Sequence, residues 1–130
     1  MQDEEAIKAL NDTFVAGLLS KDPKQRASIW SEHGTLLPPN AGLLIGRAAI
    51  EKYFALEMTS IGADSKAEFS NYRFDFLTPD LAFVDTDLTL RNVRSPDQKL
   101  LQVVPVKVVF VAERRSGRWW IRNERAHFGA

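Results

Sequence analysis

The sequence predicts an α+β fold in which three N-terminal helices pack on a curved antiparallel sheet. In the first half of the chain apolar residues recur at helical spacing, whereas after Gly62 their period changes to two. Helices followed by consecutive strands favour separate helical and sheet layers. Since a strongly bent sheet closed by helices makes a cone, we expect the open end of the cone to be the pocket.

Three segments have the helical period. Residues 3–20 begin with an acidic first turn, which the helix dipole favours. Asp22 and Pro23 predict the cap and first position of a short second helix that continues through Trp30 and ends at Gly34. Residues 46–58 form the third, with a brief strand over 35–37 and a loop over 38–42 between the two. The apolar faces of the two long helices hold Ile7, Leu10, Phe14 and Leu18, and Ile50, Phe54 and Met58.

The second half predicts four long strands, over residues 66–77 and 81–91 and within 99–128. A three-residue turn at 78–80 would place Arg73 opposite Asp85, with opposite charges paired across the strands. Pro105 cannot donate a ladder hydrogen bond, so we expect a bulge or bend there.

A four-residue turn at 114–117 would order the terminal hairpin. It places Lys107 opposite Glu124 and Phe110 opposite Ile121, so that charged and apolar side chains sort onto different faces. The inner face would then be apolar near the turn and polar at the far end. Its members are Val104, Val106, Val108, Phe110, Trp119, Ile121, Asn123, Arg125 and His127.

The outer face of this hairpin is also apolar. A sheet with one wet face should alternate apolar and polar residues, so a second apolar face needs a cover. We expect that cover to be a second copy of the chain, in a homodimer packed sheet to sheet. The interface residues would be Val103, Val109, Val111, Trp120 and Phe128.

Composition limits the classes of function. The 130 residues predict a single domain over 1–130. The 17 basic and 17 acidic side chains give a formal net charge of zero, so we expect no overall electrostatic attraction to nucleic acid or to an anionic membrane. With no cysteine and two histidines we expect no metal and no cofactor. The acidic N-terminus is unlike a signal peptide and no run has membrane-spanning length, so we expect a soluble cytoplasmic protein.

Several motifs resemble the nuclear-transport-factor-2-like superfamily. They are Asp22-Pro23 through Trp30, residues 34–39 (Gly-Thr-Leu-Leu-Pro-Pro), residues 46–54 and the ending Gly-Arg-Trp-Trp-Ile at 117–121. More narrowly they are similar to the polyketide-cyclase-like and domain-of-unknown-function-4440 branches. The resemblance implies a cystatin-like α+β cone that is often dimeric, but this fold carries many reactions.

The resemblance also bears on chemistry. The oxyanion tyrosine and basic aspartate of related ketosteroid isomerases correspond here to Phe14 and Leu37, which disfavours isomerisation by that route. Residues 73–75, Arg-Phe-Asp, match a short unit of related epoxide hydrolases, with Asp85 or Asp87 as a second carboxylate. We favour a structural cross-strand pair for Arg73 and Asp85 over this catalytic interpretation.

Two functions follow as hypotheses. The first is a small-molecule-binding protein, with or without cyclase, isomerase or hydrolase activity. Its apolar cavity would be lined by Phe14, Trp30, Leu37, Phe54 and Met58, with a polar strip of Asn123, Arg125 and His127. Arg125 would hold an anionic oxygen and His127 would carry the proton of any reaction. The second is a non-catalytic dimeric association or ligand-sequestering module. Calcium/calmodulin-dependent kinase association domains carry polar residues at similar positions of their last strand.

Overall fold

The computed structural model describes residues 2–129 and confirms the α+β class. Its elements are α1 (Gln2–Leu19), α2 (Pro23–Ala27), β1 (Trp30–Leu37), β2 (Leu44–Ile45), α3 (Arg47–Leu56), the 3-10 turn η1 (Met58–Ser60), β3 (Ile61–Thr78), β4 (Leu81–Arg94), β5 (Leu100–Arg115) and β6 (Arg118–Phe128). One sheet has the order β2-β1-β6-β5-β4-β3. Within it only β1 and β6 run parallel.

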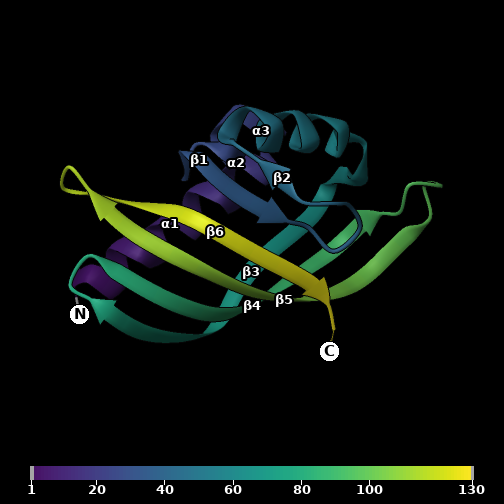
Figure 1. Cartoon of the computed structure of the whole chain (residues 1–130). Coiled ribbons are helices and arrows are strands. Elements are labelled where there is room, and N and C mark those ends of the chain that lie inside the picture. Colours follow the sequence, from purple (N-terminus) through teal and green to yellow (C-terminus); the bar gives the residue numbers. More distant parts are fainter. Residues whose placement is uncertain (1, 130) are drawn as a thin grey trace.

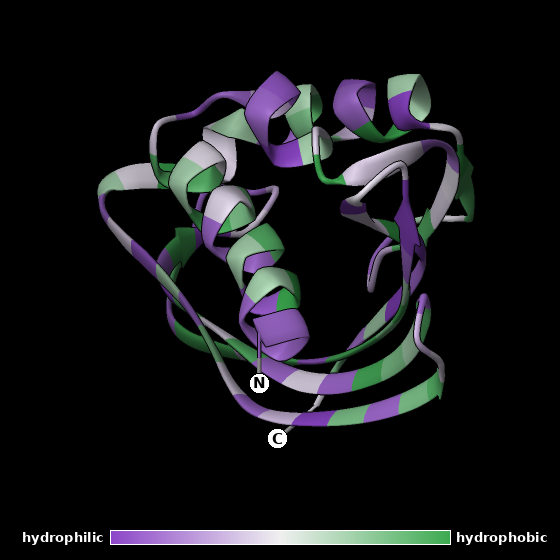
Figure 2. Cartoon of the chain, turned by 90° about the vertical axis from the view of Figure 1, so that its left-hand side faces the viewer, coloured by the Kyte–Doolittle hydropathy of each residue, from purple (hydrophilic) through white to green (hydrophobic). Residues whose placement is uncertain are grey.

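The long strands curve around α1, so that one sheet face and the helices enclose the core (Figure 1). Figure 2 shows this curvature from the side, with α1 inside the bend. Phe14 of α1 meets the rings of Trp30, Phe54 and Phe69 at centroid distances of 5.7 to 6.3 Å. The strand pairing of Arg73 with Asp85 and Phe74 with Val84 is confirmed.

The segment from Pro23 to Leu37 differs from the prediction. Pro23 begins α2 and the Asp22 side chain accepts the Gln25 backbone N–H at 3.1 Å, as a capping aspartate should. However, α2 ends at Ala27, and β1 already begins at Trp30 and runs through Gly34. The expected end of a helix at Gly34 is therefore wrong, because pairing with β6 determines this segment. The short strand β2 was also not predicted.

The predicted register of the terminal hairpin is wrong. Ser116 and Gly117, with φ of 53° and 75°, form a two-residue turn, so Ala112 pairs with Ile121 instead of with Trp119. Two consecutive residues of positive φ match the right-handed twist of the strands better than a wider turn does. The observed register therefore differs from the predicted one by two residues. Because side chains alternate with a period of two, the inner face near the turn keeps its predicted members.

A bulge at Arg122 then reverses the alternation of β6. Ala112 pairs with Ile121 but Val111 pairs with Asn123, which leaves Arg122 without a counterpart. Strand β1 is irregular at the same level, and a Cβ on Gly34 would lie only 3.0 Å from the carbonyl oxygen of Arg122. Glycine is needed for this close approach. Beyond the bulge, each β6 side chain faces opposite to the prediction.

Pro105 carries no bulge in its pairing with β4. It lies opposite Thr89 in a continuous register, so the bulge given as one of the two expectations is wrong. The carbonyl of Pro105 accepts the Gly129 N–H at 3.1 Å, so its polar edge faces the end of β6. The missing N–H is tolerated because it falls where the β6 partner strand runs out.

Candidate ligand cavity

A cavity of about 600 Å³ lies between the inner face of the sheet and the helices. Its wall combines side chains from the middle of β4 and β5 with residues of α1, α3 and the loop after β1. The apolar part includes Phe14, Phe54, Leu88, Leu90, Val106 and Val108. A largely apolar hollow of this size with a few polar groups is typical of a small-molecule site.

Glu124 of β6 is the buried carboxyl in this wall. It is 8% exposed, lines the cavity, and pairs in the sheet with Leu36 of β1 and Phe110 of β5. Within residues 2–129 no group donates a hydrogen bond to it, and burial alone raises the pKa of Glu124 to about 8. The side chain is therefore mainly a neutral carboxylic acid at pH 7, with an O–H directed at no protein acceptor.

A second polar group of the cavity is a buried ion pair. Arg26 Nη2 lies 3.2 Å from Glu57 Oε1, and the guanidinium stacks over Phe54 at 3.9 Å. The Tyr53 hydroxyl donates to either Glu57 Oε2 at 3.0 Å or Asn40 Oδ1 at 2.6 Å. Burial lowers the pKa of Arg26 despite the opposing carboxylate, and burial with the charge of Glu57 raises the pKa of Tyr53. The ion pair joins α2 to the end of α3, although Arg26 Nε is buried without a hydrogen-bond partner.

Glu57→Ala should lower the free energy of unfolding by about 2 kcal/mol, because it leaves the Arg26 charge buried without its partner. The figure is below that of a fully buried pair, since the Glu57 side chain is 30% exposed. Urea unfolding measures the change, with Lys52→Ala on the exposed side of α3 as control. An equal loss in Lys52→Ala would assign the effect to the helix instead of to the pair.

The predicted apolar lining is reproduced only in part. Phe14 and Phe54 line the cavity, while Trp30 is fully buried behind them. Leu37 is 37% exposed and lies outside the lining, where its neighbour Leu36 takes the place expected of it. Met58 is also outside the lining, although the adjacent Glu57 and Thr59 belong to it. Both faces of β1 carry buried side chains. Because the predicted strand covered only residues 35–37, its pattern did not show which face Leu37 occupies.

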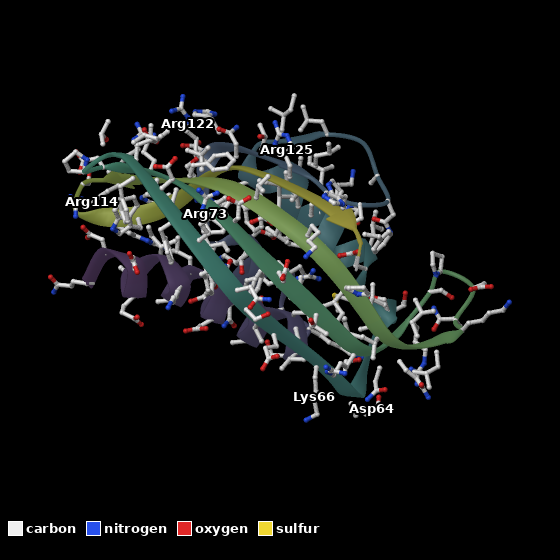
Figure 3. The ribbon with its side chains drawn as sticks, turned by 90° about the horizontal axis from the view of Figure 1, so that it is seen from below. Asp64, Lys66, Arg73, Arg114, Arg122 and Arg125 are labelled. Atoms are coloured by element: carbon white, nitrogen blue, oxygen red, sulfur yellow. The ribbon has the colours of Figure 1, made fainter. Side chains whose placement is uncertain are left out.

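The predicted inward orientation of Asn123, Arg125 and His127 is wrong. The bulge at Arg122 turns the intervening residues Glu124, Ala126 and Phe128 toward the cavity instead, and these three line it. Asn123 Nδ2 and Arg125 Nη1 both donate to Thr35 Oγ1, at 2.8 and 3.0 Å. Figure 3 shows Arg122 and Arg125 projecting from β6 away from α1. These side chains join β6 to β1 on the outer face.

The outer face, meaning the side of the sheet away from α1, also differs at one predicted position. Phe128 pairs with Val106 and lines the cavity, so it leaves the predicted interface set. Val109 and Val111 are partly exposed and Val103 is 53% exposed. Trp120 lies between two guanidinium groups, with Arg118 3.8 Å and Arg47 5.1 Å from its ring centre.

The Arg73-Phe74-Asp75 unit does not reach the cavity. Neither Arg73 nor Asp75 is part of the cavity lining, and Phe74 stacks on Tyr72 and Phe76 at 5.5 and 6.3 Å. Asp87 accepts from Lys107 Nζ at 2.8 Å and from Asn71, and these bonds hold the pKa of its carboxyl below the usual range. Lys107 thus pairs with Asp87 and not with Glu124 as predicted. These contacts favour the structural interpretation.

Glu124 is the candidate site residue that sequence reasoning missed. Regular alternation from the turn places it on the outer face, opposite a lysine. Only the bulge at Arg122 moves it inside, and the single sequence signal is that Gly34 permits β1 to approach. Across residues 2–129 there is no cluster of three or more potential metal ligands. No helix of that range is long and apolar enough to cross a membrane.

Solved structures share the whole architecture. One from Xanthomonas campestris, named as a calcium/calmodulin-dependent protein kinase II association domain, has 27% identity and a TM-score of 0.79 over 95% of this chain and 85% of its own. An uncharacterised protein with a cystatin-like fold from Caulobacter vibrioides has 18% identity and a TM-score of 0.84, over 100% and 92%. A hexachlorocyclohexane dehydrochlorinase from Novosphingobium barchaimii has 17% identity and a TM-score of 0.83, over 99% and 88%.

The chain has the cystatin-like fold of these structures. This confirms the cystatin-like α+β fold that the resemblance implies, while the narrower branch stays a prediction. No protein-family model and no curated protein matches the sequence. This fold hosts both enzymes and association domains, so the function of this protein has to be argued from its own cavity.

Proposed function

We propose that this protein binds a small, neutral, mainly apolar organic molecule in the cavity between α1 and the sheet. The observation that carries the proposal is the Glu124 carboxyl, which lines an apolar cavity with no protein partner among the described residues. A buried polar group without a partner costs free energy that a ligand acceptor would recover. The ligand therefore needs one oxygen or nitrogen acceptor and an apolar body.

Most of the charge that lines the cavity is neutralised; Arg94 adds a cation whose Nη1 is buried without a hydrogen-bond partner and could donate to an acceptor on the ligand. The carboxyl of Glu124 is mainly protonated near pH 7, and Arg26 is already paired with Glu57 at 3.2 Å. The predicted anion holder Arg125 lies on the other face with Thr35. One similar structure carries the name of a dehydrochlorinase, whose substrate is an apolar organic molecule, which is consistent with the size and apolarity of this cavity.

The neutral dye N-phenyl-1-naphthylamine should bind the unmodified protein with a rise in fluorescence, because its emission increases in apolar surroundings. Ala126→Phe should weaken this binding at least tenfold, since Ala126 lines the cavity and the added ring would occupy ligand space. Titration by fluorescence measures both affinities.

His127→Phe provides the matched control for the dye experiment. It places the same phenyl ring at the next residue of β6, where it replaces an imidazole that is exposed and points away from the cavity. The dye affinity of this variant should equal that of the unmodified protein. If the dye binds the unmodified protein and both variants equally, it occupies another surface and the cavity is not a ligand site.

The second candidate function is a homodimeric association module. The outer face of β4 and β5 centres on Phe83, Val109 and Val111, with Phe83 38% exposed. Across this centre Asp85 lies in one row with Val109 and Arg125. A two-fold axis along β5 would place β4 of each copy over β6 of the other, and thus Asp85 over Arg125. The likeness at 27% identity to a structure named as a kinase association domain supports this candidate.

A further inference from the structure

We infer that the cavity takes an elongated neutral molecule with a carbonyl or similar acceptor near each end, and that Arg94 of β4 binds the acceptor farther from Glu124. The inference rests on the proposed binding function of the cavity and names the class of its ligand. Two hydrogen-bonding groups of the same cavity wall carry it. The Glu124 carboxyl and Arg94 Nη1 both lack a protein partner among the described residues.

The sheet places these two groups far apart along the cavity. Glu124 lies opposite Phe110 of β5, whereas Arg94 lies opposite Leu100 of the same strand. Ten residues of strand separate these two levels, which corresponds to about 33 Å along the curved β5. Even with the reach of both side chains, one small functional group cannot contact both. A ligand that satisfies the two groups therefore needs two separate acceptors.

The cavity wall between the two groups is apolar. On β4 and β5 it consists of three opposed pairs of aliphatic residues. They are Leu88 with Val106, Leu90 with Val104, and Val93 with Leu101. Such a surface favours the burial of a hydrocarbon chain or ring system, and it offers no side-chain donor to a polar group in the middle of the ligand. The two acceptors of the ligand are therefore joined by an apolar body.

Arg94 has no carboxylate of its own among residues 2–129. Asp97, in the loop that follows β4, is paired with Lys99 at 3.7 Å. Glu57, which also lines the cavity, is paired with Arg26 at 3.2 Å. Of the guanidinium nitrogens of Arg94, Nη1 is the one buried without a partner, so the others keep their contact with solvent. The charge thus stays hydrated, and a neutral carbonyl is sufficient for Nη1.

Arg26 is the other arginine of the wall with an unpartnered buried atom, its Nε. Its guanidinium is held in place by Glu57 at 3.2 Å and by stacking on Phe54 at 3.9 Å. Arg94 makes neither kind of contact within the described part of the chain, so its guanidinium is free to turn toward an acceptor in the cavity. We therefore assign Arg94, and not Arg26, to the ligand.

Matched straight-chain esters test the inference by displacing the naphthylamine dye. The dimethyl esters of sebacic, dodecanedioic and tetradecanedioic acid carry a carbonyl at each end, whereas the methyl esters of the monoacids of equal length carry one. The diester of best-fitting length should bind the unmodified protein about tenfold more tightly than its monoester, because it makes a second hydrogen bond. Arg94→Met should abolish this preference, since methionine keeps a long apolar side chain but donates no hydrogen bond.

Arg91→Met is the matched control. It makes the same exchange at an exposed position of β4, opposite Val103 and outside the cavity lining, so it should keep the preference for the diester. The dye, whose one polar group is a weakly accepting amine, should bind both variants as it binds the unmodified protein. Without ester, Arg94→Met should not lower the free energy of unfolding, because it removes a donor that has no protein partner. A structural role for Arg94 would lower it.

The outcomes separate this inference from the binding function. If the dye binds but diesters and monoesters displace it equally, or if Arg94→Met keeps the preference, the two-acceptor ligand is overturned and the cavity remains a binding site. If dodecanoate binds more tightly than every diester, and Arg94→Met removes that binding, Arg94 holds an anion and the neutral class is overturned. If neither the dye nor any ester binds the unmodified protein, both proposals are overturned.

Discussion

Glu124→Gln is expected to make the protein more stable at alkaline pH and to leave its stability almost unchanged near pH 5. In the folded protein burial holds the pKa of Glu124 at about 8, against an ordinary value of 4.5. Between these values the unfolded chain has released a proton that the folded chain retains. Stability of the unmodified protein should therefore fall as pH rises through this window.

Glutamine removes this dependence because it has no proton to lose. Above about pH 8 the gain in unfolding free energy should be on the order of 4 kcal/mol, since each pKa unit corresponds to about 1.4 kcal/mol. Urea unfolding of both proteins at several pH values measures the gain. Glu113→Gln exchanges a carboxyl for an amide on the outer face, beside Arg122 at 3.9 Å. A gain of the same size and pH dependence in that control would show that Glu124 is not its source.

Val111→Glu is expected to convert a homodimer into a folded monomer. Val111 lies between Phe83 of β4 and Asn123 of β6, at the centre of the outer face. In a dimer with its two-fold axis along β5, the two copies of this residue would meet, and two carboxylates would be buried together. Burying two like charges in that position costs several kcal/mol, which opposes association of the two copies.

Light scattering on the unmodified protein and the variant checks this expectation. Leu19→Glu at the exposed end of α1 is the control, because it adds the same charge to an apolar surface site remote from the sheet. It should leave the dimer intact. If light scattering shows that the unmodified protein is already a monomer at micromolar concentration, the predicted dimer is refuted. Trp120 is the weaker probe, because Arg47 and Arg118 would pair with a glutamate placed between them.

The roles predicted for His127 and Arg125 show how one bulge in a strand changes a functional hypothesis. His127 and Arg125 were assigned to the cavity by counting alternate residues from the turn, which assumes an uninterrupted strand. The count is correct from Trp119 to Ile121, both of which are buried. One extra residue at Arg122 then exchanges the two faces, and the neutral Glu124 replaces a cationic strip in the cavity. The expected ligand changes accordingly from an anion to a neutral molecule.

The sequence by itself determined the fold class, the helix of residues 3–20 and the pairing of Arg73 with Asp85. These features depend on local periodicity, capping and the matching of opposite charges across a tight turn, all of which act over a few residues. The turn itself differs from the predicted three residues, because Thr78 pairs with Leu81 after a register shift. The capping aspartate and Pro23 likewise placed the start of α2 correctly. The motifs at both ends of the chain also indicated the cystatin-like fold, which the similar structures share.

Only the tertiary structure decided which residues face the cavity. The close approach of β1 at Gly34 and the bulge at Arg122 arise because two strands from opposite ends of the chain pair in parallel. Such pairing depends on contacts about ninety residues apart, between Thr35 and Asn123 or Arg125, and leaves no periodic mark in either segment. The same pairing buries Glu124 among apolar neighbours, and that burial is what gives this carboxyl its altered chemistry.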